Sequence, residues 1–158
     1  MDRRIKELLR LLDEGYDTPT WHGPNLRAAV ARVKVEEALR RPGPRRHNIW
    51  ELTVHAAYWK YTVRRRLLGE KRGSFVLKGS NWFAAPASAT EEEWRATLAL
   101  LAEEHRRLRA AVAKFPAAKL HRRMKASKWT AAQSISGVAM HDIYHAGQIQ
   151  LVKRFVRN

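Results

Sequence analysis

Apolar residues recur along most of the chain at the three- and four-residue spacing of an α-helix. Four segments keep this spacing over several turns, and Asn48, Thr90 and Thr130 stand where helix caps are expected. Asn48 is followed three residues later by Glu51, a pattern that predicts a reciprocal capping box. The four predicted helices cover residues 5–15, 48–68, 90–115 and 130–156.

The remaining residues complete an all-α reading. A shorter helical piece is predicted from Pro24 towards Leu39, and Pro42-Gly43-Pro44 ends it. Residues 70–89 lack helical spacing, and such long connections in compact domains are often functional. No segment shows strand alternation, and no repeat or linker is found. Residues 1–158 are therefore expected to form one domain, a four-helix bundle with short extra helical segments near the N-terminus.

The apolar stripe of the last predicted helix contains two histidines. Its positions follow one another at intervals of 3, 4, 3, 4 and 3 residues, as in a heptad seam that faces a neighbouring helix. His141 and His145 are one turn apart, so both imidazoles are expected on one face, close enough to hold one ion. The six seam positions are Val138, His141, His145, Gln148, Val152 and Phe155.

The second long segment places a third histidine, His55, on its inward stripe. A buried neutral imidazole needs partners for both ring nitrogens, and an unsatisfied one costs roughly 1–3 kcal/mol. A divalent cation would satisfy His55, His141 and His145 together, and bundle cores are a known place for such sites. The alternative is that each ring is a core residue, bonded separately to a carbonyl or a hydroxyl group. The inward stripe is Leu52, His55, Trp59 and Val63.

Charge adds a second class of function. The chain has 31 Lys and Arg against 15 Asp and Glu, a net charge of +16. Such a charge attracts polyanions without specificity, so nucleic acid or an anionic substrate has to be considered. The arginines are dispersed over several predicted helices and loops, and no helix-turn-helix or zinc-finger spacing occurs. The alternative is that the arginines keep helix faces solvated and have no binding role.

The chain contains no cysteine, which excludes disulfides, thiolate metal sites and cysteine nucleophiles. The first fifteen residues are charged throughout and lack the apolar run of a signal peptide. No stretch approaches the roughly 20 apolar residues that span a bilayer. The sequence thus predicts a soluble cytoplasmic protein without membrane partners.

Three stretches carry a resemblance to a known family. Together, in order and spacing, they are similar to the DinB/YfiT-like superfamily of proposed metal-dependent enzymes, which is unrelated to the polymerase sharing the DinB name. The resemblance implies a four-helix bundle in which His55, His141 and His145 bind nickel, zinc or a similar divalent ion. It also implies a homodimer, which would suit the apolar residues Met140, Tyr144 and Leu151. The three stretches are Trp21–Pro24, Ile49–His55 and His141–Ile149.

Three imidazoles would leave at least one coordination position open, as in catalytic metal sites. Water bound there would have its pKa lowered to about 7, which makes hydroxide available at neutral pH. Alternatively, the open position would bind a thiolate and deliver it to an electrophile. The resemblance implies both routes, a hydrolase or a thiol-dependent transferase acting on a small molecule with a low-molecular-weight thiol. A metal-binding or nucleic-acid-binding stress protein without turnover is the competing class.

Several further residues are candidates for chemistry beside the ion. His22 is a candidate acid or base, with helix capping or loop packing as its alternative. Gln148 follows His145 in the seam, where it could orient a ligand or bond across helices. His105 is a fourth inward histidine, either an additional ligand or a ring bonded to the backbone. The HDIYH stretch resembles the zinc-protease pattern, but Asp142 is a methylene too short, so we expect it solvent-facing or behind the ligands.

Structural roles are predicted for two further histidines and four tryptophans. His47 and His121 lie beside arginines and are expected on the surface. Four tryptophans are expected in the core, where they would not contact substrate. They are Trp50, Trp59, Trp82 and Trp129.

Overall fold

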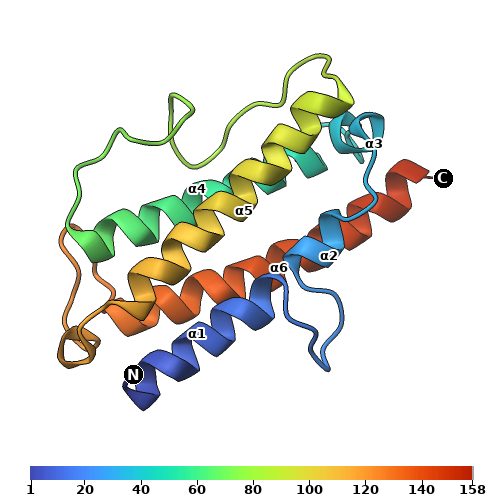
Figure 1. Cartoon of the computed structure of the whole chain (residues 1–158). Helices are drawn as coiled ribbons and strands as arrows, with labels where there is room; N and C mark the ends of the chain where they lie inside the picture. Colours follow the sequence, from blue (N-terminus) through green and yellow to red (C-terminus); the bar gives the residue numbers. More distant parts are fainter. Residues whose placement is uncertain (158) are drawn as a thin grey trace.

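The computed structural model describes residues 1–157 and is all-helical there. Four long helices lie side by side, of which α1 covers only part of the length of α6, and two short ones, α2 and α3, lie near one end (Figure 1). The 3₁₀ turn η1 (Ala117–Lys119) belongs to the connection between the last two long helices. The helices are α1 (Arg3–Tyr16), α2 (Leu26–Val30), α3 (Val35–Leu39), α4 (Ile49–Leu68), α5 (Glu91–Ala113) and α6 (Ala131–Arg157).

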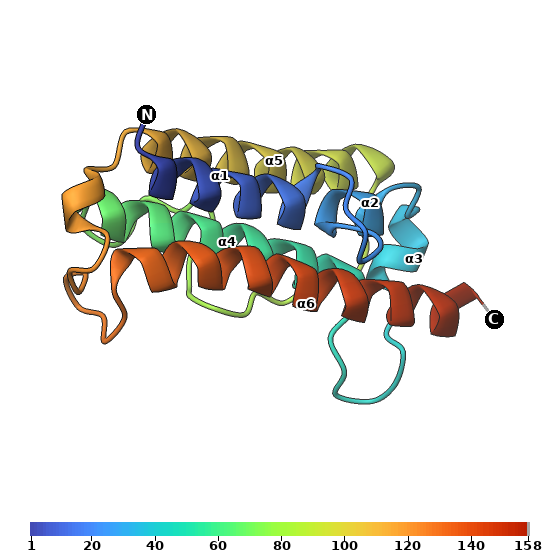
Figure 2. The same cartoon turned by 90° about the horizontal axis from the view of Figure 1, so that it is seen from below.

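The long helices form the predicted four-helix bundle. Helix α4 packs against α5 and α6, and α1 packs against α6 and α5 (Figures 1 and 2). Residues 70–89 run as an extended connection along the outside of α4, without helix or strand. At the α1–α6 contact, a Cβ on Gly15 would lie 2.8 Å from the carbonyl oxygen of Ala139, so only glycine permits this approach. None of the helices within residues 1–157 has the length and apolarity to cross a bilayer.

Caps fix the helix boundaries much as the sequence indicates. The side chains of Asn48 and Thr90 accept hydrogen bonds from backbone N–H groups at the starts of α4 and α5. Gly69 ends α4 in the left-handed conformation, with φ of 71°. The predicted box at α4 is only half right, because the Glu51 carboxylate binds Arg41 and His47 and does not reach back to the Asn48 N–H.

Two local predictions are wrong. The piece from Pro24 to Leu39 is not continuous, since Arg32 adopts φ of 57° and separates α2 from α3. Phe155 does not face the core, and 60% of its surface is exposed. The buried face of α6 lies against α1 and α4 and is shifted around the helix from the predicted seam. The seam therefore runs along the edge of the core, where polar side chains meet cavities.

A buried ion pair crosses the bundle. Lys60 of α4 and Asp142 of α6 are fully buried and in direct contact. Lys60 also donates to Nδ1 of His105, at 3.3 Å, and the His105 ring stacks on Tyr16. Asp142 is thus not solvent-facing, and within residues 1–157 its carboxylate bonds to Lys60 and to none of the candidate ligands. A carboxylate at the centre of α6 needs a cation from the facing helix because burial of an unpaired charge is prohibitive.

Candidate metal centre

Three histidines from two helices meet at one point. His55 comes from α4, while His141 and His145 are one turn apart on α6. The Nε2 atom of His141 lies 3.1 Å from Nε2 of His55 and 2.9 Å from Nε2 of His145. Each ring offers a nitrogen within 4.8 Å of the others, the arrangement of a three-histidine metal group. The prediction that the three rings meet at one point is confirmed.

Hydrogen bonds on the far sides of the rings fix their orientation. Nδ1 of His55 donates to the backbone carbonyl of Asn81, at 2.8 Å. Nδ1 of His145 donates to Oε1 of Gln148, at 2.6 Å. A neutral imidazole that donates from Nδ1 carries a lone pair on Nε2. Both rings therefore direct lone pairs at His141.

Protein atoms alone do not satisfy this cluster. A proton on Nε2 of His141 could be donated to one neighbouring lone pair, but the other lone pair would then receive no hydrogen bond. Nδ1 of His141 is buried and has no hydrogen-bond partner among residues 1–157. A divalent cation would resolve the conflict at the Nε2 atoms, since separations of 3.1 and 2.9 Å fit ligands roughly 2.0–2.1 Å from a shared ion. The residues present thus fit a metal.

Burial keeps the rings neutral, which is the state that binds metal. Loss of hydration lowers the pKa of His55 to about 4. The same effect, reinforced by the charges of the other two rings, lowers the pKa of His141 to about 3. Burial also lowers the pKa of His145, against the opposing effect of the hydrogen bond that its Nδ1 donates to Gln148. At neutral pH a cation would not have to displace protons from these nitrogens.

The 70–89 connection supplies an aromatic wall. Trp82 stacks on His55, with ring centroids 3.8 Å apart, and His47 stacks on the other face of Trp82, at 3.6 Å. The preceding residue, Asn81, accepts from Nε1 of Trp59 through its side chain, at 3.0 Å. Neither Asn81 nor Trp82 was predicted from the sequence as a residue of the site. Only the length of their connection indicated that it had a function.

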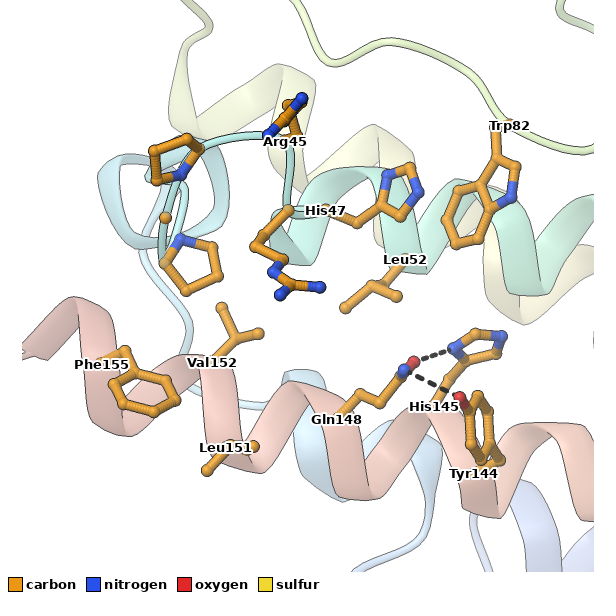
Figure 3. Close-up of a pocket in the computed structure, with 14 residues that line it drawn as sticks. Arg45, His47, Leu52, Trp82, Tyr144, His145, Gln148, Leu151, Val152 and Phe155 are labelled. Carbon is orange, nitrogen blue, oxygen red and sulfur yellow. Dashed lines mark hydrogen bonds between the residues drawn. The ribbon is translucent and has the colours of Figure 1, made fainter.

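Two cavities adjoin the histidines. The loop cavity, of about 860 Å³, lies between residues 42–47 and α6, and Figure 3 shows Gln148 bonded to both His145 and Tyr144 in its wall. The tryptophan cavity, of about 770 Å³, is lined by all three histidines together with Trp59, Trp82 and Trp129. Both cavities share Trp82, Tyr144 and His145. The candidate ion site can therefore be approached from two sides.

Of the four tryptophans predicted in the core, two lie outside it. Trp50 is buried in the core, as expected, and Trp59 is partly buried beside the histidines. Trp82 and Trp129 are 38% and 51% exposed and line the tryptophan cavity, so they are not core residues. Both lie in connections between helices, and helical periodicity carries no information about side chains there.

The other candidate residues occupy distinct places. His22 bonds to Thr20 in the exposed α1–α2 connection and lines neither of the two cavities. His121 is exposed, and His47 is an exposed residue at the edge of the loop cavity. Gln148 lies in the wall of the site. The structure thus brings Gln148, and not His22, to the three histidines.

His105 is buried, as predicted, but faces away from the candidate ion. Lys60 donates to its Nδ1, so the ring proton lies on Nε2, which points towards Asp13 at 3.9 Å. Asp13 is held in turn by Arg109, at 2.7 and 3.0 Å. The group formed by His105, Asp13 and Asp17 has no imidazole lone pair to offer a second ion.

Comparisons with known proteins agree with this geometry. No curated protein and no solved structure matches the chain significantly. The sequence profile of the DinB superfamily matches residues 20–149, which include His55, His141 and His145. The match extends over most of the chain and over three of the four long helices. The chain belongs to the DinB superfamily.

Proposed function

We propose that this chain is a metal-dependent enzyme that holds one divalent ion on His55, His141 and His145. The observation that carries the proposal is the meeting of three Nε2 atoms, two of them with lone pairs set by Asn81 and Gln148. Three protein ligands leave a coordination position for a reactant, which distinguishes catalytic from structural sites. Nickel and zinc both suit an all-imidazole ligand set.

The chain's own residues would organise the reaction around that position. A bound divalent ion would supply the acidity that activates a water or a thiol. Gln148 orients His145 through Oε1 and Tyr144 through Nε2, so one amide couples a ligand to the cavity wall. Trp82 fixes the plane of His55 and shields it from solvent. These contacts position the ligands before any reactant arrives.

The cavities indicate a small-molecule substrate. Their volumes, about 860 and 770 Å³, fall in the usual range for small-molecule sites. Because they share only a wall that includes His145, a thiol could approach from one side and an electrophile from the other. This two-sided access favours a thiol-dependent transferase over a hydrolase, for which a single cavity would suffice.

Metal content tests the ligand assignment. Protein purified without added metal and then loaded with Ni²⁺ or Zn²⁺ should hold one equivalent by elemental analysis. His145→Ala should reduce this to near zero without loss of helical circular dichroism, because it removes one ligand and alanine favours the helix. His121→Ala, a histidine exposed in a connection, is the matched control and should retain the full equivalent. Full metal content in His145→Ala would refute the assignment.

The protein loaded with Co²⁺ separates the two chemical routes. Addition of a low-molecular-weight thiol should produce a near-ultraviolet sulfur-to-metal charge-transfer band if the open position accepts a thiolate. Absence of the band, together with hydrolysis of an ester probe, would favour the water route. Metal binding without either response would leave a non-catalytic metal-binding protein.

We further propose that the chain forms a homodimer through one face of α6. Four large apolar side chains on this helix are 56% to 66% exposed, an unusual cluster for a solvated surface. Tyr144, Leu151 and Phe155 also line the loop cavity, so a second copy would lie beside its opening. The four residues are Met140, Tyr144, Leu151 and Phe155.

A further inference from the structure

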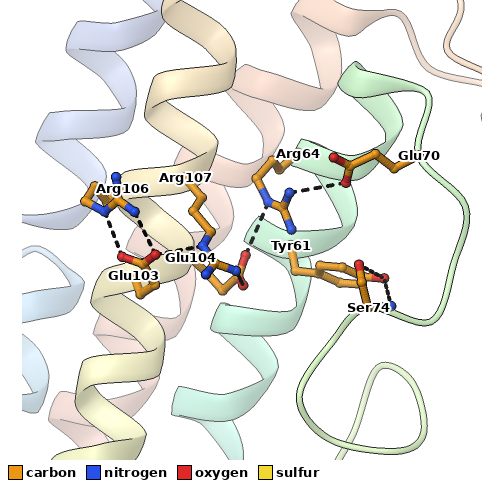
Figure 4. Close-up of polar contacts among 8 residues, drawn as sticks. All are labelled: Tyr61, Arg64, Glu70, Ser74, Glu103, Glu104, Arg106 and Arg107. Atoms are coloured by element: carbon orange, nitrogen blue, oxygen red, sulfur yellow. Dashed lines mark hydrogen bonds and ion pairs between the residues drawn. The ribbon is translucent and has the colours of Figure 1, made fainter.

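Positive charge is balanced unevenly over the molecule. On α5, Glu103 accepts from both Arg106 and Arg107 at 2.7 Å. Arg64 at the end of α4 lies between Glu70 and Glu104 (Figure 4). These cations are matched by acids one turn away or on the facing helix. By contrast, the sequence from residue 114 to residue 128 contains six Lys and Arg and no acid.

We call this stretch the basic connection. Its six cationic side chains are all exposed. Within residues 1–157, none of them forms an ion pair. Their charge is therefore available to an external anion. The cations are Lys114, Lys119, Arg122, Arg123, Lys125 and Lys128.

The basic connection has a defined conformation. The backbone N–H of Met124 donates to the carbonyl of Trp129, and that of Ala131 donates to Arg122, at 3.2 and 3.1 Å. The side chains of Leu120 and Met124 are buried against the bundle. Because the apolar side chains point inward, the cations point outward from a fixed turn. Such a turn can present several charges without first being ordered.

The end of α4 extends the same charged surface. Figures 1 and 2 place the C-terminal end of α4 beside the connection between α5 and α6, at one end of the bundle. Arg66 of α4 and Trp129 line the same cavity. Burial, and then the neighbouring charges of Arg65 and Arg72, lower the pKa of Arg66. Arg66 itself forms no ion pair within residues 1–157.

A flat aromatic ring lies within this charged surface. Trp129 is 51% exposed, and Nζ of Lys128 is 5.1 Å from its ring centroid. Exposed aromatic rings flanked by cations bind single-stranded nucleic acids, because bases stack on the ring while the cations contact phosphates. By contrast, the ring of Trp82 beside the metal centre is stacked against two histidine rings.

We propose that the basic connection, with Arg66 and Trp129, binds single-stranded nucleic acid and that this binding does not require a bound metal. Duplex is disfavoured because these cations lie on a turn, and no helix presents them to a major groove. A bilayer surface is disfavoured because Leu120 and Met124 point inward, which leaves Trp129 as the one large apolar side chain of the stretch 119–129 that could insert.

Fluorescence anisotropy with a labelled 20-nucleotide single strand tests the proposal, in EDTA so that metal plays no part. Arg122→Gln/Arg123→Gln/Lys125→Gln should weaken binding at least tenfold. It should also lower the slope of log Kd against log salt by about 2, since each lost phosphate contact contributes roughly 0.7. Trp129→Ala should weaken binding about fivefold or more, the effect of losing one stacked base.

The matched control removes three charges elsewhere. Arg32→Gln/Arg95→Gln/Arg154→Gln changes three exposed arginines that have no ion pair within residues 1–157, and it has the same net charge as the first triple variant. It should weaken binding less than threefold. An equal loss in both triples would show that only net charge matters and would overturn the proposal.

Two further results would also overturn it. Tighter binding to a duplex of the same length would contradict the stacking role of Trp129. Binding to phosphatidylglycerol vesicles, lost in the first triple variant and accompanied by no affinity for the single strand, would identify a membrane surface. Circular dichroism of each variant should match that of the parent chain. Because metal is absent, failure here leaves the proposed enzymatic function untouched.

Discussion

At the level of single residues, the site depends on atoms that face away from it. The Nδ1 atoms of His55 and His145 are engaged by Asn81 and Gln148, and this leaves Nε2 of each ring for an ion. The ligands themselves were predictable, because histidines at helical spacing on apolar stripes are unusual. Asn81 was not, because a backbone carbonyl can be supplied by any residue type.

The backbone conformation of Asn81 gives the first prediction. Its φ of 66° is tolerated by asparagine and glycine and is strained for alanine. Asn81→Ala should therefore displace the carbonyl that accepts from His55 and weaken metal binding about tenfold or more. Asn81→Gly keeps the conformation and loses only the bond to Trp59, so its loss should be smaller. Competition with a chromophoric chelator measures both, and equal effects would contradict this role of the carbonyl.

Four buried histidines determine the response of stability to pH. The pKa values of His55, His141 and His105 are lowered to about 4, 3 and 3, and that of His145 is lowered as well. In the unfolded chain these rings take up protons below about pH 6.5, whereas the folded rings do not. The contribution of these rings to the free energy of unfolding is therefore complete above pH 6.5 and decreases as the pH drops towards 4.

Urea unfolding of the metal-free protein should show this loss. Between pH 6.5 and 5 the rings of His55, His105 and His141 should each contribute about 1–2 kcal/mol of destabilisation. Burial raises the pKa of Asp142 to about 6, so this carboxyl group stabilises the fold as the pH drops. It is one group against four histidines with the opposite effect. His105→Gln should flatten the pH dependence by one ring's share. A stability that is constant from pH 7 to 5 would contradict the buried, neutral state of the rings.

At the level of elements, caps and breakers determined what the sequence could predict. Asn48, Gly69 and Thr90 are local signals, and the boundaries that depend on them agree with the structure. The break at Arg32 and the exposed position of Phe155 depend on how neighbouring helices pack. Heptad spacing defines a face of α6 but does not show how far that face is turned away from α1 and α4.

The contact between Lys60 and Asp142 gives a prediction for the packing of α4 on α6. Lys60→Met should destabilise the fold by about 3–5 kcal/mol, because an uncompensated carboxylate would remain buried. Lys60→Met/Asp142→Leu should recover much of this loss, since both charges are removed. Arg106→Ala, in an exposed pair with Glu103, is the control and should cost less than about 1 kcal/mol.

Urea unfolding at pH 7 measures all three variants. A double variant that is no more stable than Lys60→Met would show that the ion pair does more than compensate its own burial. It would then stabilise the interface between α4 and α6 through His105 and Tyr16, which contact Lys60.

At the level of the whole molecule, association through α6 is the property to measure. Leu151→Glu should convert a dimer of 18.3 kDa chains to monomers in sedimentation velocity, because it places a charge within the apolar face. Val76→Glu changes an exposed apolar residue of the 70–89 connection and should leave association unchanged. A stable dimer should persist at a concentration of about 50 μM. A parent chain that sediments as a monomer at that concentration would refute the dimer.

The three histidines come from only two of the four long helices, and this has a consequence for how the chain opens. An ion held there would tie residue 55 to residues 141 and 145, closing a loop of more than half the sequence in a protein without cysteine. It would thus serve as a reversible cross-link between α4 and α6. Amide hydrogens of α4 and α6 should exchange more slowly once metal is added, while those at the free start of α1 keep their rate.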